Sequence, residues 1–225
     1  MSRTTGLLLV LMKSNVAAAE AEWGAWYDKV LMPAMLRDGP WAGTRWEVWP
    51  KPAPGMPGVG FTHVSMLEFD GDHPANDARA FLARAPQRGV PMNPHHAVVS
   101  LQIATAHGRH VDKTSPTPEL RGQILAWVFC NQPAVEAEWD AWYDREHVPD
   151  MMESGAFTAL TRWKLDPRPH FGPTHLTIYD TPLDTIEEAV ERSAQSLAKL
   201  TAAGRKHRCH TGGMSVTLRR AKPQV

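Results

Sequence analysis

The sequence holds very few cysteines and no excess of either charge. Two cysteines, Cys130 and Cys209, occur in 225 residues, and 24 lysines and arginines balance 24 aspartates and glutamates. The cysteines are too few and too far apart in sequence for a disulfide framework or a sulfur-rich metal site. A chain without clustered positive charge has no electrostatic attraction for a phosphate backbone. We therefore expect a reducing compartment and no nucleic-acid partner.

Long apolar runs and the common cofactor motifs are missing as well. No run reaches the roughly 18 to 20 apolar residues that cross a bilayer, so no membrane partner is expected. We find no Gly-rich phosphate loop, no dinucleotide-binding fingerprint, no Gly-x-Ser-x-Gly elbow and no His-Glu-x-x-His helix. These absences argue against nucleotide cofactors and serine hydrolysis, and the scattered histidines show no ligand spacing that favours a metal site.

An internal repeat organises the chain. The residues Ala-Glu-Ala-Glu-Trp-Gly-Ala-Trp-Tyr-Asp at 19–28 recur as Val-Glu-Ala-Glu-Trp-Asp-Ala-Trp-Tyr-Asp at 135–144, and further matches follow in the same order. Ordered matches of this kind indicate a duplicated structural unit. We predict two copies, residues 1–106 and 122–225, joined by a polar, proline-containing linker at 107–121.

The apolar run at 7–12, with the alanines that follow it, resembles a short signal peptide. Its counterpart at 124–129 lies inside the chain. A segment that recurs internally is better explained as a buried strand than as a removable leader. We therefore expect a strand here and a cytoplasmic protein.

Hydrophobic periodicity predicts the same order of elements in each copy: strand, helix, strand, strand, helix, strand. We expect the first helix to end before Pro33 or Pro149, because proline cannot continue the backbone bonding of a helix. The order is that of a ferredoxin-like βαββαβ unit, so the expected fold class is α+β. The expected strands are 7–12, 41–49, 61–69 and 98–106 in the first copy and 124–129, 157–165, 174–180 and 214–220 in the second, with second helices at 76–85 and 183–203.

The second copy resembles a known superfamily. Its residues Trp-Asp-Ala-Trp-Tyr-Asp-Arg-Glu-His-Val-Pro-Asp at 139–150, followed by Gly-Ala-Phe at 155–157 and Thr-Arg-Trp at 161–163, are similar to the signature of dimeric α/β-barrel proteins, particularly the EthD-like ones. The first copy is similar more weakly, and together the copies cover nearly the whole chain. Relatives usually build the barrel from two chains, so a tandem repeat implies two sheets that pack face to face within one chain. A further homodimer is left open.

Five side chains share one face of the first helix in the second copy, because they are spaced three and four residues apart. The first copy has Val30 and Leu31 where the last two of these residues, a glutamate and a histidine, stand. This polar pair points to a site in the second copy, although a partly exposed helix end would also explain it. The five residues are Trp139, Trp142, Tyr143, Glu146 and His147.

These residues suggest proton-transfer chemistry. A histidine titrates near neutrality, so His147 is the candidate proton carrier at the mouth of a cavity. Tyr143 could orient it or stabilise an oxyanion. Asp144 could fix its tautomer, or simply be solvated. We expect Trp139, Trp142 and Met151 as apolar walls and Glu146 as a binding residue, with core packing the ordinary alternative for the aromatic rings.

Two further histidines and an arginine complete the predicted site. His175 shares a strand face with Thr177 and Tyr179, a face that either lines a cavity or is structural. Cyclase members of the superfamily place one histidine on this strand and another just before the last strand, and the resemblance implies His175 and His210 for these roles. Arg162 could bind a substrate carboxylate or phenolate, or form a salt bridge at the sheet edge.

The leading prediction is an enzyme of the cyclase, dehydratase, isomerase or lyase type. It would act by acid/base chemistry, without cofactor or metal, on a hydrophobic small molecule of aromatic or polyketide-like character. His147, His175 and Tyr143 are the predicted catalytic residues. Two alternatives stay open. One is a haem-binding oxidoreductase, because the resemblance extends to tandem chlorite-degrading enzymes that hold haem in one half through a histidine. The other is a non-catalytic binder of a small molecule.

Overall fold

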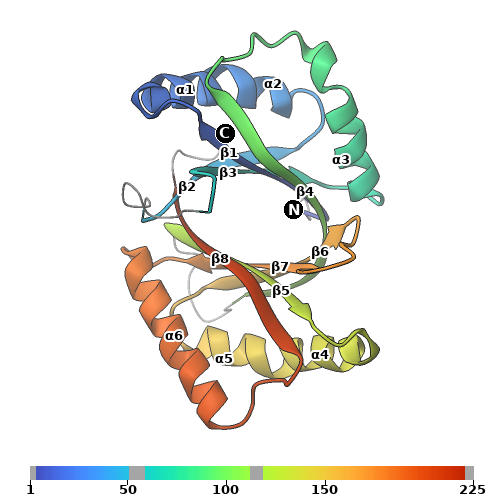
Figure 1. Ribbon diagram of the computed structural model, residues 1–225, viewed down its shortest axis with the longest axis vertical. Coiled ribbons are helices and arrows are strands. Elements are labelled where there is room, and N and C mark those ends of the chain that lie inside the picture. The colour runs from blue at the N-terminus through green and yellow to red at the C-terminus, as the bar shows by residue number, and fades with distance from the viewer. Residues whose placement is uncertain (1–3, 51–58, 112–118, 221–225) are drawn as a thin grey trace. The chain divides into compact units, whose positions relative to one another are not determined.

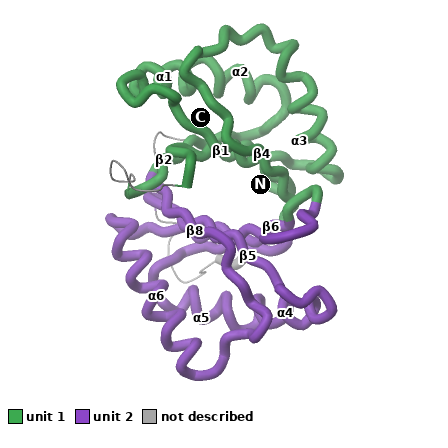
Figure 2. Tube along the Cα trace, viewed as in Figure 1, with its two compact units in different colours: residues 1–106, 165–167, 220–225 green, residues 107–164, 168–219 purple. Residues whose placement is uncertain are grey.

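The computed structural model describes residues 4–50, 59–111 and 119–220 of the chain. These residues form two compact units (Figure 2). The first is built mainly from the chain up to Ala106, and the second from His107–Lys164 and Arg168–Arg219.

The first unit is a four-stranded antiparallel sheet in the order β4-β1-β3-β2. Helices cover one face of this sheet (Figure 1). Its elements are β1 Gly6–Ser14, α1 Glu20–Trp26, a π-helical turn Tyr27–Leu31, α2 Met32–Leu36, β2 Ala42–Val48, β3 His63–Phe69, α3 Pro74–Ala83 and β4 His96–Val111, with 3-10 turns at Ala17–Ala19 and Ala85–Arg88.

The second unit repeats this arrangement in the strand order β8-β5-β7-β6. Its helices again lie on one face of its sheet (Figure 1). Its elements are β5 Gly122–Cys130, a 3-10 turn Pro133–Val135, α4 Glu136–Trp142, a π-helical turn Tyr143–His147, α5 Val148–Glu153, β6 Ala159–Asp166, β7 His175–Thr181, α6 Ile186–Ala202 and β8 His210–Arg220.

Each unit therefore has the βαββαβ order that the repeat predicts, and the α+β fold class with two tandem ferredoxin-like units is confirmed. The stretch expected as a linker, 107–121, begins with the last residues of β4, which extends to Val111. Residues 112–118 of that stretch lie outside the described residues. Among the described helices, none combines the length and apolar character that would carry it across a bilayer.

The helical stretch that begins with α1 or α4 does not end before its proline, so that expectation is wrong. Pro33 and Pro149 each stand in the first turn of a further α-helical segment, α2 or α5, directly after the π-helical turn. A proline has no N–H to donate, but the N–H groups of a first turn need no partner within their own segment. The wider turn before the proline lets the chain continue as one helical stretch.

Aromatic side chains from these stretches build the cores. Trp23 and Tyr27 in the first unit and Trp139 and Tyr143 in the second are almost completely buried. They stand four residues apart, so they lie on the face of the helix that packs against the sheet. Burying large rings in this way supplies much of the driving force for folding.

Gly6 in β1 gives a test of this packing. A Cβ built on Gly6 would lie 2.3 Å from Cβ of Pro74, the rigid first residue of α3, whereas a Cβ on Gly212 in β8 would meet nothing within 4 Å. We expect Gly6→Ala to lower the free energy of unfolding by about 1–3 kcal/mol. Gly212→Ala, its control, should change it by less than about 0.5 kcal/mol. Chemical denaturation measures both, and equal stabilities of the two variants would contradict the packing described.

Candidate active site

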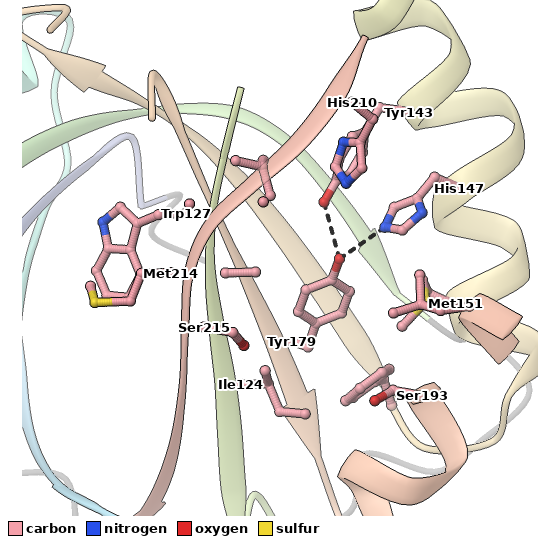
Figure 3. Close-up of a pocket in the computed structure, with 16 residues that line it drawn as sticks. Ile124, Trp127, Tyr143, His147, Met151, Tyr179, Ser193, His210, Met214 and Ser215 are labelled. Atoms are coloured by element: carbon pink, nitrogen blue, oxygen red, sulfur yellow. Dashed lines mark hydrogen bonds between the residues drawn. The ribbon is translucent and has the colours of Figure 1, made fainter. Parts of the chain in front are cut away.

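The second unit contains a cavity of about 360 Å³ between its sheet and its helices. Side chains from β5, β7 and β8 form one wall, and residues of the π-helical turn, α5 and α6 form the other (Figure 3). The wall is mainly apolar and includes Ile124, Ala126, Trp127, Val128, Met151, Phe157, Leu197 and Met214. The polar side chains that reach it are Tyr143, His147, Tyr179, Ser193, His210 and Ser215.

The π-helical turn brings Tyr143 and His147 together. Their ring centroids lie 4.5 Å apart, and both side chains are buried. Residues four apart in a helix share a face, and the widened turn adjusts how that face meets the sheet. The turn thus directs a phenol and an imidazole towards the same strand, β7.

A chain of hydrogen bonds joins these side chains to β7. The Tyr143 hydroxyl lies 2.9 Å from Oγ1 of Thr177 and 3.0 Å from the Tyr179 hydroxyl. The Tyr179 hydroxyl in turn lies 3.2 Å from Nε2 of His147 (Figure 3). Each hydroxyl can donate one hydrogen bond and accept others, so the whole chain can run in either direction. Reversing it changes the tautomer of His147 and moves a proton along the chain.

Burial sets the protonation states of this chain. His147 is 4% exposed, and Nδ1 has no hydrogen-bond partner among the described residues. The pKa of His147 is lowered to about 3, mainly by burial, with the nearby His210 and Arg162 acting in the same direction. Burial raises the pKa values of Tyr143 and Tyr179. At neutral pH the imidazole is therefore uncharged and both phenols keep their protons.

His210 is held in one tautomer. Nε1 of Trp139 donates a hydrogen bond to Nδ1 of His210 over 3.2 Å. An indole N–H can only donate, so Nδ1 must accept, and the ring proton of neutral His210 lies on Nε2. Burial lowers the pKa of His210 to about 4, with Lys206 and His207 contributing. The first unit has the same bond, from Trp23 to His96, at 3.1 Å.

The first unit lacks the hydrogen-bond chain. Leu31 stands there in the position of His147, and Leu67 stands in the position of Tyr179. A leucine has no polar hydrogen, so the tyrosine of the first unit, Tyr27, cannot be linked to an imidazole in this way. The polar difference that the sequence shows on the helix is thus matched by a second difference on the strand.

The structure brings four predicted site residues to the cavity: Tyr143, His147, Met151 and His210. Trp139 and Trp142 are buried behind the histidines instead of lining the cavity. Nε1 of Trp142 donates to the carbonyl oxygen of Arg205 over 2.6 Å, and its ring lies 5.4 Å from that of His147. The tryptophans therefore support the site from behind.

Glu146, Arg162 and His175 also lie outside the cavity lining. Glu146 is 44% exposed and lies 3.8 Å from Arg205. Arg162 is 1% exposed and binds Asp144 over 2.7 Å, which agrees with the salt-bridge alternative and engages Asp144 away from His147. His175 packs against Trp139, with 5.0 Å between ring centroids.

Several cavity residues were not predicted. Tyr179 is the most informative, because it links His147 to Tyr143. Alignment of the two copies could have identified it, because Tyr179 aligns with Leu67 of the first copy. Trp127, Phe157, Ser193 and Ser215 carry no comparable signal, because each reaches the cavity through the packing of strands and helices far apart in sequence.

Comparison with known proteins identifies the fold and no family. No protein family matches the sequence, and no curated protein does. A chlorite dismutase variant from Candidatus Nitrospira defluvii matches with a TM-score of 0.58 at 8% identity, over 97% of this chain and 91% of its own. A protein described as a monooxygenase from Fusobacterium nucleatum gives a TM-score of 0.56 at 9% identity, over 97% and 94%. An anthrone oxidase-like protein gives 0.51 at 12% identity, over 100% and 95%.

At such low identity these similarities show the fold alone. Each match covers both units of this chain and supports the tandem ferredoxin-like fold. The expected resemblance to dimeric α/β-barrel proteins agrees with these matches in fold. The narrower resemblance to EthD-like proteins stays a prediction.

The burial of His147 predicts how stability depends on pH. An unfolded histidine binds a proton below about pH 6.5, whereas folded His147 does so only near pH 3. Between these pH values the unfolded state binds more protons than the folded state. The free energy of unfolding is therefore undiminished by His147 above pH 6.5 and decreases as the pH falls towards 3. The variant His147→Leu carries the residue that the first unit has at this position. It should decrease the slope of the free energy of unfolding against pH by up to about 1.4 kcal/mol per pH unit.

Denaturant unfolding at several pH values between 6.5 and 4.5 measures this slope. Glu146→Gln, at the exposed neighbouring position, is the matched control and should keep the wild-type slope. A His147→Leu slope equal to that of the wild type would show that His147 is not held neutral in the fold.

Proposed function

We propose that the second unit is a cofactor-independent enzyme for acid/base reactions of a small aromatic or polyketide-like molecule, of the cyclase, dehydratase, isomerase or lyase type. The observation that carries this proposal is the buried chain Thr177–Tyr143–Tyr179–His147 at the wall of an otherwise apolar cavity. The first unit has the same fold with leucines at two of these positions. A unit of this kind can therefore fold without the hydrogen-bond chain.

The cavity favours a small, neutral ligand with aromatic surface. Its volume of about 360 Å³ is at the lower end of the roughly 300–1,000 Å³ typical of ligand pockets. Phe157 contributes an aromatic ring to the lining, and the described lining residues include no lysine, arginine, aspartate or glutamate. An ionised ligand would find no counter-charge in this wall, whereas a ketone or phenol would find hydrogen-bond partners.

The protonation states favour stabilisation of a developing oxyanion. A neutral imidazole and two protonated phenols can donate hydrogen bonds to a ligand oxygen without carrying charge themselves. When a proton leaves a carbon next to a ligand carbonyl or conjugated with it, negative charge develops on that oxygen, and donors fixed in an apolar cavity stabilise it strongly. The developing charge would also raise the pKa of His147, so that this side chain could take up the proton.

A histidine with an ordinary pKa could act as a base towards water, and His147 differs from it in this respect. Its pKa of about 3 makes it a poor base towards water. Tyr179 lies between His147 and Tyr143 and can pass a proton between them in either direction. We assign His147 and Tyr179 to proton transfer, Tyr143 to holding Tyr179 in place, and His210 to donation from Nε2 into the cavity.

Deuterium exchange into anthrone, a tricyclic aromatic ketone with an acidic methylene group, tests this proposal. The wild-type protein should accelerate exchange in anaerobic D₂O, followed by mass spectrometry. Because general acid/base groups contribute about 10² to 10⁴ in rate, His147→Leu and Tyr179→Phe should slow the exchange by factors in or near that range. Quenching of tryptophan fluorescence reports binding, which both variants should retain within a few fold.

The matched control for exchange is Glu146→Gln, which lies outside the cavity and should behave as the wild type. Binding without accelerated exchange would favour the non-catalytic binder and contradict the enzyme. Exchange that is unchanged in His147→Leu would contradict the assigned residues.

The second candidate function is haem binding, which the fold similarity to chlorite dismutase favours. A histidine that ligates iron needs a lone pair on one ring nitrogen and donates its other N–H to an acceptor. In His210 the Trp139 indole occupies Nδ1 and places the proton on Nε2. In His147, Tyr179 occupies Nε2, and Nδ1 is fully buried. The described cavity residues therefore do not fit a haem iron.

Haem titration distinguishes the two functions. We expect added hemin to give no sharp Soret band that saturates at one haem per chain, because the Trp139 indole engages Nδ1 of His210 and Nδ1 of His147 is fully buried. A saturating Soret band that disappears in His210→Ala would contradict the cofactor-independent function and establish the alternative.

A further inference from the structure

His107, Asp140 and His175 form a second polar cluster, separate from the cavity. They come from the end of β4, from α4 and from the start of β7. One nitrogen or oxygen ligand atom of each lies within 4.8 Å of those of the other two. Nε2 of His107 lies 2.7 Å from Oδ2 of Asp140. None of the three residues lines the cavity.

We propose that this cluster, the HDH cluster, binds one divalent transition-metal ion. Two imidazoles and one carboxylate are the donor set of catalytic zinc sites and of facial-triad iron sites, both of which leave coordination positions open. The ion would replace the hydrogen bond between His107 and Asp140, and small side-chain movements would bring the three donors to the usual distance of about 2.0–2.2 Å from Zn²⁺.

His175 is already arranged as a ligand. It is 2% exposed, and its Nδ1 lies 2.9 Å from the hydroxyl oxygen of Thr174. That oxygen can accept from Nδ1–H, which leaves the lone pair on Nε2. Nε2 is buried and has no hydrogen-bond partner in the described part of the chain. A buried polar atom without a partner is unfavourable, and a metal ion would satisfy it.

Asp140 divides its two oxygens between different partners. Arg162 binds Oδ1, so Oδ2 is the oxygen that faces His107. The charge of Arg162 is shared with Asp144, which it binds over 2.7 Å. Nζ of Lys164 lies 3.7 Å from Oδ2, but this side chain is 48% exposed and can turn towards solvent. Lys164 is therefore an exposed positive charge that competes with a bound cation for Oδ2.

The first unit shows which part of the cluster is not needed for the fold. Thr62 and His63 repeat the contact of Thr174 and His175, with 3.0 Å between Oγ1 and Nδ1. Gly24 stands in the position of Asp140, so the carboxylate ligand is missing there. The histidine with its threonine belongs to both units, whereas a carboxylate at the position of Asp140 belongs to the second; the carboxylate near His63 is Glu20, whose Oε1 lies 3.9 Å from Nε2.

Zinc titration of the full chain, after removal of metal with a chelator, tests the proposal. Competition with a chromophoric chelator gives stoichiometry and affinity. We expect one Zn²⁺ per chain, and His107→Ala and Asp140→Asn should each weaken binding at least about tenfold. Absorption of the Co²⁺-substituted protein should show bands of a site with mixed nitrogen and oxygen ligands that both variants lose. The surface variant His73→Ala is the control and should bind as the wild type.

Lys164→Gln separates loss of ligands from loss of fold. Removing this competing charge should strengthen Zn²⁺ binding, an effect that misfolding cannot produce. The proposal is overturned if the wild type binds no Zn²⁺, if His107→Ala and Asp140→Asn bind it unchanged, or if Lys164→Gln weakens it. These readouts do not depend on turnover, so they stand apart from the function proposed for the cavity.

Discussion

An imidazole buried in an apolar wall must find a counter-charge or stay neutral, and the cavity side of His147 offers no carboxylate among its described lining residues. Because the buried imidazole is neutral, its ring nitrogen needs uncharged hydrogen-bond partners, and the surrounding hydroxyl groups supply them. Tyr179 satisfies Nε2 of His147, Tyr143 satisfies Tyr179, and Thr177 completes the chain from the neighbouring position on β7. The same burial that removes the charge also makes these uncharged donors effective towards a ligand oxygen.

The duplicated chain separates what the fold needs from what the site adds. Both units keep a tryptophan that donates to a histidine, Trp23 to His96 and Trp139 to His210, so this contact belongs to the architecture. The repeat made the order of elements predictable, because the same sequence pattern in both copies indicates the same secondary structure in both. It could not predict that the helix continues past Pro149, since this depends on a π-helical turn that periodicity does not reveal.

The site was predictable only in part, for a physical reason. The spacing along one helix places Tyr143 and His147 on one face, and both side chains line the cavity in the structure. Spacing cannot show which partner each ring nitrogen finds across the sheet. His175 was expected in the cavity, yet it lies with His107 and Asp140, residues distant in sequence that only tertiary packing brings together. The scattered histidines gave no metal-ligand spacing for the same reason.

The protonation state of His147 tests the central claim most directly. Nitrogen-15 NMR of the imidazole, assigned by comparison with His147→Leu, reports charge and tautomer at each pH. The structure predicts a neutral ring throughout the range from pH 7.5 to 4.5, because burial lowers its pKa to about 3. An ordinary titration of His147 near pH 6.5 would contradict the buried hydrogen-bond chain and the chemistry assigned to it.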